Sequence, residues 1–111
     1  MAYDDEFAVR VRTLLDGAPG LVELSMFGGI GWTVNGNLAV GTLGEVLICR
    51  VGPEAQALLD EPGVDVFDLT GRAMKGWLTV EIEALDADDA LQEWLDRGVR
   101  FASSLPAKPQ K

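Results

Sequence analysis

The dipeptide Asn35-Gly36 constrains the fold of this chain more than any other feature, because alternating apolar residues lead into it. Ile30, Trp32 and Val34 alternate with smaller or more polar residues, which predicts a strand with one buried face. Asn-Gly favours the positive φ angles of a type I′ turn, which joins adjacent antiparallel strands. The sequence therefore predicts a β-hairpin whose return strand begins at Asn37.

Similar alternation elsewhere extends this hairpin into an antiparallel meander and adds a second hairpin. Gly28-Gly29 predicts a turn or a bulge between the first two strands, and Leu43-Gly44 predicts a turn before a strand that ends near Arg50. A turn at Thr70–Gly76 is expected to join the last two strands. The predicted strands are 22–26, 30–34, 37–41, 45–51, 64–69 and 77–82.

Three segments carry apolar residues at helical spacing. Asp4 or Asp5 is expected to cap a first helix that ends at Gly17, and Gly52-Pro53 opens a short helix that reaches Asp60. Asp86 is expected to cap the last helix. The apolar stripe of that helix comprises Leu91, Trp94, Leu95, Gly98, Ala102 and Leu105.

The order helix, meander, helix, hairpin, helix predicts an α+β two-layer sandwich, in which helices flank an antiparallel sheet. We expect a single domain over residues 1–105 and a flexible tail over 106–111. No apolar run is long enough to span a membrane, and the acidic N-terminus does not resemble a signal peptide. The single cysteine fits a cytoplasmic protein.

Composition argues against several functional classes. The formal net charge of −9 disfavours direct binding to nucleic acid or to an anionic membrane. The chain has no histidine, so the commonest general base and metal ligand are missing. Cys49 lies in a predicted core strand, where a buried thiol is a commoner role than a nucleophile. We therefore expect no enzymatic activity, no metal and no cofactor.

Two glycine-rich or acidic stretches have structural explanations beside a functional one. The acids at 86, 88 and 89 suit the start of a helix, and a metal site there would need further oxygen ligands. Gly28-Gly29 and Gly31 resemble a phosphate loop only loosely, because a strand follows them where a helix should begin. A bulge or turn is the expected role of these glycines.

Basic residues are concentrated at one place in the body of the chain. Between Thr13 and Asp96 there are three basic residues, Arg50, Arg72 and Lys75, against fifteen acids. Each of these three basic residues could simply pair with a nearby acid, such as Asp68 or Glu81. Alternatively they form an anion or peptide-carboxylate site, which Met74 and Trp77 would extend into a partner surface.

Four sequence pieces resemble the N-terminal domain of the TfoX/Sxy family, and the likeness covers nearly the whole chain. They are Met26-Phe27-Gly28-Gly29, Val34-Asn35-Gly36-Asn37, Arg50-Val51-Gly52-Pro53 and Gly71-Arg72-Ala73-Met74-Lys75-Gly76. The resemblance implies a bacterial, cytoplasmic α+β domain. The best-known members regulate natural competence genes and carry a second, helical C-terminal domain, which this sequence does not contain. No catalytic residues are implied.

These observations predict a non-enzymatic regulatory module that binds a protein through Arg50, Arg72, Met74, Lys75 and Trp77. Met26, Phe27, Gly28, Gly29, Gly71 and Gly76 are expected to be structural. Self-association into a homodimer, through a sheet edge or the basic turn, is a further expectation. The alternative is a domain that binds a small anion, or acts as an enzyme on one, through Arg50, Arg72 and Lys75.

Overall fold

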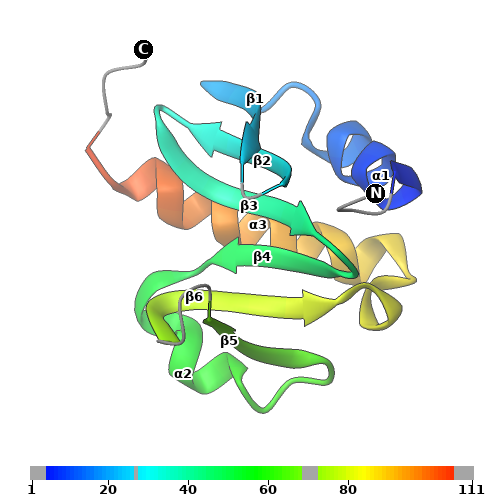
Figure 1. The fold of residues 1–111 in the computed structure, drawn as a ribbon. Coiled ribbons are helices and arrows are strands. Elements are labelled where there is room, and N and C mark those ends of the chain that lie inside the picture. Colours follow the sequence, from blue (N-terminus) through cyan, green and yellow to red (C-terminus); the bar gives the residue numbers. More distant parts are fainter. Residues whose placement is uncertain (1–4, 27, 69–72, 107–111) are drawn as a thin grey trace.

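The computed structural model describes residues 5–26, 28–68 and 73–106, without the side chains at positions 5, 26, 73 and 74 (Figure 1). The helices are α1 (Asp5–Leu15), α2 (Ala55–Leu58) and α3 (Asp88–Ser104), with 3₁₀ turns η1 (Gly52–Glu54) and η2 (Ile82–Leu85). The strands are β1 (Leu21–Met26), β2 (Gly29–Val34), β3 (Asn37–Leu43), β4 (Val46–Arg50), β5 (Val64–Asp68) and β6 (Ala73–Glu81).

The six strands form one antiparallel sheet in the order β1-β2-β3-β4-β6-β5. In Figure 1, α3 crosses behind the central strands, where it packs against β3 and β4. Helix α1 packs against α3, and α2 packs beside β6. The predicted α+β fold, with an antiparallel meander sheet and flanking helices, is therefore confirmed.

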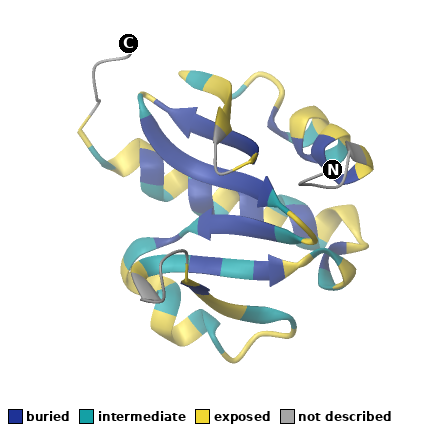
Figure 2. Ribbon diagram, in the orientation of Figure 1, coloured by how far each residue is buried: buried dark blue, intermediate teal, exposed yellow. Residues whose placement is uncertain are grey.

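The core lies between the sheet and α3, as the dark central strands of Figure 2 show. Leu47, Cys49 and Val51 alternate along and beyond β4 and are all buried in this core, as their period-two spacing predicts. The stripe on α3 meets them with Leu91, Trp94 and Leu95. Burial of such side chains stabilises the fold by roughly 1.5–3 kcal/mol each.

The meander turns follow the predicted chemistry. Asn35 and Gly36 have φ angles of 52° and 84°, the pair of positive values that a type I′ turn requires. Met26 of β1 pairs with Gly29 of β2, and Gly28, which precedes β2, has a φ of 81°. The pairing of β2 with β3 is irregular between Trp32 and Thr33, where the register shifts.

Several predicted boundaries were wrong. The last strand begins at Ala73, well before the predicted residue 77, so Lys75 and Gly76 belong to β6 and the connection to β5 falls within residues 69–72, outside the described part. The second helix is a 3₁₀ turn followed by the single turn of α2, and does not reach Asp60. Leu105 lies just beyond α3, as its C-cap residue.

Asp86 does not cap the last helix. The N-cap is Ala87, which makes no side-chain capping bond, while Asp86 closes the 3₁₀ turn η2. Arg10 of α1 contacts the connection between η2 and α3: its Nη2 atom donates to the carbonyl oxygens of Leu85, at 2.9 Å, and Asp86, at 3.2 Å. The same guanidinium forms an ion pair with Asp88 in the first turn of α3.

Candidate functional site

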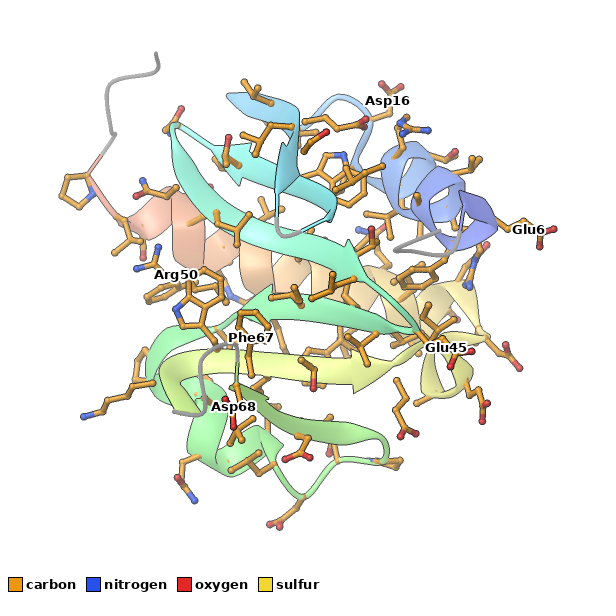
Figure 3. The ribbon with its side chains drawn as sticks, viewed as in Figure 1. Glu6, Asp16, Glu45, Arg50, Phe67 and Asp68 are labelled. Atoms are coloured by element: carbon orange, nitrogen blue, oxygen red, sulfur yellow. The ribbon has the colours of Figure 1, made fainter. Side chains whose placement is uncertain are left out.

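The end of β4 carries a cluster of one arginine and three aromatic rings. Arg50 pairs in register with Trp77 on β6, and its Cζ atom lies 5.3 Å from the centroid of the Trp77 ring. The same atom lies 5.4 Å from the centroid of Phe101 on α3. Phe67 of β5 packs against Trp77 with ring centroids 6.0 Å apart. We call these four residues the Arg50 cluster; Figure 3 shows Arg50 and Phe67 toward this end of the sheet.

Two glycines, Gly52 and Gly76, allow the backbone segments next to the Arg50 cluster to lie close to each other and to the Phe101 ring. Gly76 has a φ of 85°, and its carbonyl accepts a 2.9 Å hydrogen bond from the Val51 amide. A Cβ atom at position 76 would lie 3.2 Å from the Gly52 Cα, and one at position 52 would overlap the Phe101 ring. Both positions also have positive φ, so glycine is required for conformation as well as for space.

Arg50 differs from the other arginines that the structure describes. Arg10 pairs with Asp88, Arg12 with Glu23, Arg97 with Glu93 and Arg100 with Glu54, at distances of 2.7 to 4.0 Å. Within the described ranges, Arg50 contacts aromatic rings but makes no hydrogen bond or ion pair. Its expected pairing with a nearby acid is therefore not formed. Arg50 is half-buried, and the N–H donors of its guanidinium are available to another group.

A hollow of about 300 Å³ adjoins the Arg50 cluster on the side of α2. Its walls come from Gly52 and Pro53, from Gln56 on α2, from Val66 on β5 and from Trp77 on β6. Lys75 lies at the same hollow, is exposed, and has no ion pair among the described residues. Gly52 and Trp77 line this hollow and also contact members of the Arg50 cluster, so the hollow and the cluster are adjacent.

The other candidate groups have structural surroundings. Burial raises the pKa of the Cys49 thiol to about 12, and its Sγ atom donates to the Trp94 carbonyl at 3.3 Å. A thiol in this state is not a nucleophile at neutral pH. Asp88 pairs with Arg10, and the described part of the chain brings together no group of three potential metal ligands. No described helix has the length and apolarity needed to cross a membrane.

Comparison with protein families places the whole arrangement in a known group. The model of the TfoX N-terminal domain matches residues 13–102 of the 111-residue chain. The chain belongs to the TfoX N-terminal domain family. No curated protein matches it.

In this TfoX N-terminal domain, the family-like sequence pieces are divided between the two ends of the sheet. Gly29 lies opposite Met26, at the end where β4 begins, whereas Arg50 to Pro53 and Gly76 meet at the end where β4 finishes. Asn35-Gly36 also turns at this second end, since Val34 pairs with Leu21 at the start of β1. The structure therefore brings two separate sequence pieces into contact through the bond from Val51 to Gly76.

The structure brings some of the predicted site residues together, and others lie outside the residues that it describes. Arg50 and Trp77 are in contact, and Lys75 borders the adjoining hollow. Arg72, Phe27 and Gly71 lie outside the described residues, as does the side chain of Met74, so their predicted roles remain predictions. Sequence reasoning missed Phe101, which is not among the residues of the predicted apolar stripe on the last helix. The signal for it was indirect: a ring on that helix meets Gly52, whose lack of a side chain makes room for it.

Proposed function

We propose that this TfoX N-terminal domain is a non-enzymatic regulatory module that binds another protein by holding one of its carboxylates at Arg50. The observation that carries the proposal is the Arg50 guanidinium, which has no ion pair among the described residues of a chain with eighteen acids and nine bases. The other described arginines have found carboxylates within the chain. A partner would supply the carboxylate that Arg50 lacks.

The Arg50 cluster suits this role physically. Arginine binds a carboxylate through two parallel N–H donors, and the planar guanidinium also stacks on aromatic rings. Contact with Trp77 and Phe101 restricts the Arg50 side chain before any partner arrives, which lowers the entropy lost on binding. Tryptophan and arginine are also enriched among the residues that dominate protein interfaces.

Charge favours a single carboxylate over a nucleic acid. Binding along a phosphate backbone needs several lysines or arginines, and the net charge of −9 opposes it. A local pair of unpartnered cations, Arg50 and Lys75, can still attract one acidic group at short range. We infer that the domain works in the bacterial cytoplasm, as the likeness to competence regulators implies.

The test is comparative capture from a cytosolic extract of the source organism. Immobilised wild-type chain, Arg50→Gln and Arg100→Gln are compared by quantitative mass spectrometry, after circular dichroism has shown that each is folded. Arg100 is the matched control, because it lies beside Phe101 and its loss changes the net charge equally. We expect a protein that wild type and Arg100→Gln retain and Arg50→Gln loses at least tenfold, equivalent to about 1.4 kcal/mol. Equal retention by all three chains would refute the proposal.

A second candidate function is the binding of a small anionic metabolite, and the hollow beside Lys75 favours it. Its volume of about 300 Å³ is at the lower end of the range for ligand pockets. A thermal-shift screen of nucleotides, sugar phosphates and carboxylates tests this candidate. A ligand at 100 times its dissociation constant should stabilise the domain by about 2.7 kcal/mol. No shift with any of these compounds would remove this candidate and leave the protein-binding function.

A further inference from the structure

The hollow beside the Arg50 cluster has apolar walls that the capture of a carboxylate does not use. Leu59, Leu78 and Val66 contribute side chains to it from α2's end, β6 and β5, together with Pro53 and Ala55. Val66 is 38% exposed, although it is a β-branched residue on a strand. Two polar residues also line the hollow, Gln56 of α2 and Lys75 of β6.

We propose that this hollow receives an apolar side chain from the same partner segment whose acidic residue binds Arg50. This inference rests on the proposed function and specifies the recognised motif: an extended segment of another protein with an aliphatic or aromatic residue close to an aspartate or glutamate. Charge complementarity selects an acidic segment, since Arg50 and Lys75 both lack a carboxylate partner within the described chain.

The geometry allows one short segment to reach both places. Trp77 stacks with Arg50 and also lines the hollow, and Gly52 lines the hollow while it touches Phe101. The two subsites therefore meet at Trp77 and Gly52, at the end of the sheet. An extended chain advances about 3.3 Å per residue, so neighbouring side chains or side chains a few residues apart can fill both.

The hollow should contribute as much to affinity as the ion pair. Complete burial of a leucine-sized side chain contributes roughly 1.5–3 kcal/mol, which corresponds to about ten- to hundredfold in the dissociation constant. The carboxylate fixes orientation, because the donors of Arg50 lie in one plane. Loss of Arg50 should thus weaken binding and remove the preference for an acidic residue. Loss of the hollow should weaken binding and remove the preference for an apolar residue.

The experiment is selection of a random heptapeptide library displayed on phage against four chains: wild type, Arg50→Gln, Val66→Trp and Val22→Trp. Val66→Trp fills the hollow from β5. Val22→Trp is its matched control, since Val22 is 40% exposed on β1, at the opposite edge of the sheet. Gln56→Trp fills the hollow from α2 and replaces Val66→Trp if that chain does not fold.

Wild type and Val22→Trp should enrich peptides that have an acid within about three residues of a leucine, isoleucine, methionine or aromatic residue. Val66→Trp or Gln56→Trp should keep the preference for the acid and lose the apolar preference, with about tenfold weaker binding of the selected peptides. Arg50→Gln should lose the preference for the acid. If wild type selects acids without an apolar neighbour, the hollow is not a subsite and the carboxylate site stands. If wild type shows no preference for acids, the proposed function itself fails.

Discussion

At the scale of single residues, the described arginines divide into those that hold the fold together and one that does not. Arg10 links α1 to the start of α3 through two backbone carbonyls and Asp88. Arg50 touches rings alone within the described residues. Residues kept for binding commonly contribute little to folding, so their substitution should affect function more than stability.

Substitution of these two arginines should therefore have different effects on stability. Arg10→Gln removes the charge-assisted hydrogen bonds to the Leu85 and Asp86 carbonyls and the ion pair with Asp88, and should lower the free energy of unfolding by about 1–3 kcal/mol. Arg50→Gln removes only the contacts of the guanidinium with aromatic rings and should cost about 1 kcal/mol. Urea denaturation of both variants checks this. A larger loss for Arg50→Gln than for Arg10→Gln would make Arg50 a structural residue.

Glu23 should make stability depend on acid pH. Hydrogen bonds from Arg12 lower the pKa of Glu23 below its ordinary value of 4.5; burial opposes this, and the charge of Arg12 and the Trp32 Nε1–H bond add to it. A carboxyl with a lowered pKa stabilises the fold above its unfolded pKa, and this stabilisation is lost as pH falls through the folded value. Glu23 is 37% exposed, so solvent screens part of the effect.

We accordingly expect Glu23→Gln to destabilise the domain at neutral pH and to approach wild-type stability at about pH 3. Glu6→Gln, at an exposed position on α1, controls for the general loss of a carboxylate. Chemical denaturation at both pH values measures the difference. If the gap between Glu23→Gln and wild type is the same at both, Glu23 does not supply the pH dependence.

At the scale of elements, close contact between α3 and β3 depends on Gly98. A Cβ atom at this position would lie 2.5 Å from the Ala39 carbonyl oxygen and 2.7 Å from Val40 Cγ1. The Ala39 backbone cannot move away from an added methyl group as the end of a flexible side chain can. The helix would have to move away from the sheet, which would loosen the packing of Leu95 and Ala102 on either side of the glycine.

Gly98→Ala should therefore destabilise the domain by about 1–3 kcal/mol, although alanine favours helices by about 1 kcal/mol over glycine. The exposed Ser103→Ala, on the same helix, should be neutral or slightly stabilising. Thermal and urea unfolding of both variants decide the matter. Stabilisation by Gly98→Ala would show that α3 does not approach the sheet this closely.

Elements were predictable where local chemistry determines them. Asn35-Gly36 needs only its own backbone preferences to form the turn, and the core position predicted for Cys49 follows from the apolar residues around it. The start of β6 was not predictable in this way. Gly76 suggested a turn, but the structure places this residue, with its positive φ, within β6. Its carbonyl accepts a hydrogen bond from the Val51 amide, and these two residues are far apart in sequence. The N-cap of α3 was predicted wrongly because Ala87 occupies it, a residue whose side chain cannot accept a capping hydrogen bond.

At the scale of the whole molecule, the candidate site exists only because several distant segments meet at one end of the sheet. Arg50 and Trp77 were candidates on the basis of charge and residue type, and strand pairing places them opposite each other. Phe101 and the hollow depend on how α3 and α2 pack, which no local pattern specifies. The fold of this family member could thus be inferred from sequence, whereas the composition of the site required the tertiary structure.

The central claim is that Arg50 is free to bind a carboxylate, and nuclear magnetic resonance tests it directly. ¹⁵N-labelled protein is titrated with N-acetyl-glutamate N-methylamide and, as a matched neutral compound, the glutamine analogue. The account predicts saturable shifts of the Arg50 Nε–H and Trp77 Nε1–H signals with the glutamate compound alone, and their absence in Arg50→Gln. Identical shifts with both compounds, or shifts that occur elsewhere while Arg50 and Trp77 stay unchanged, would contradict it.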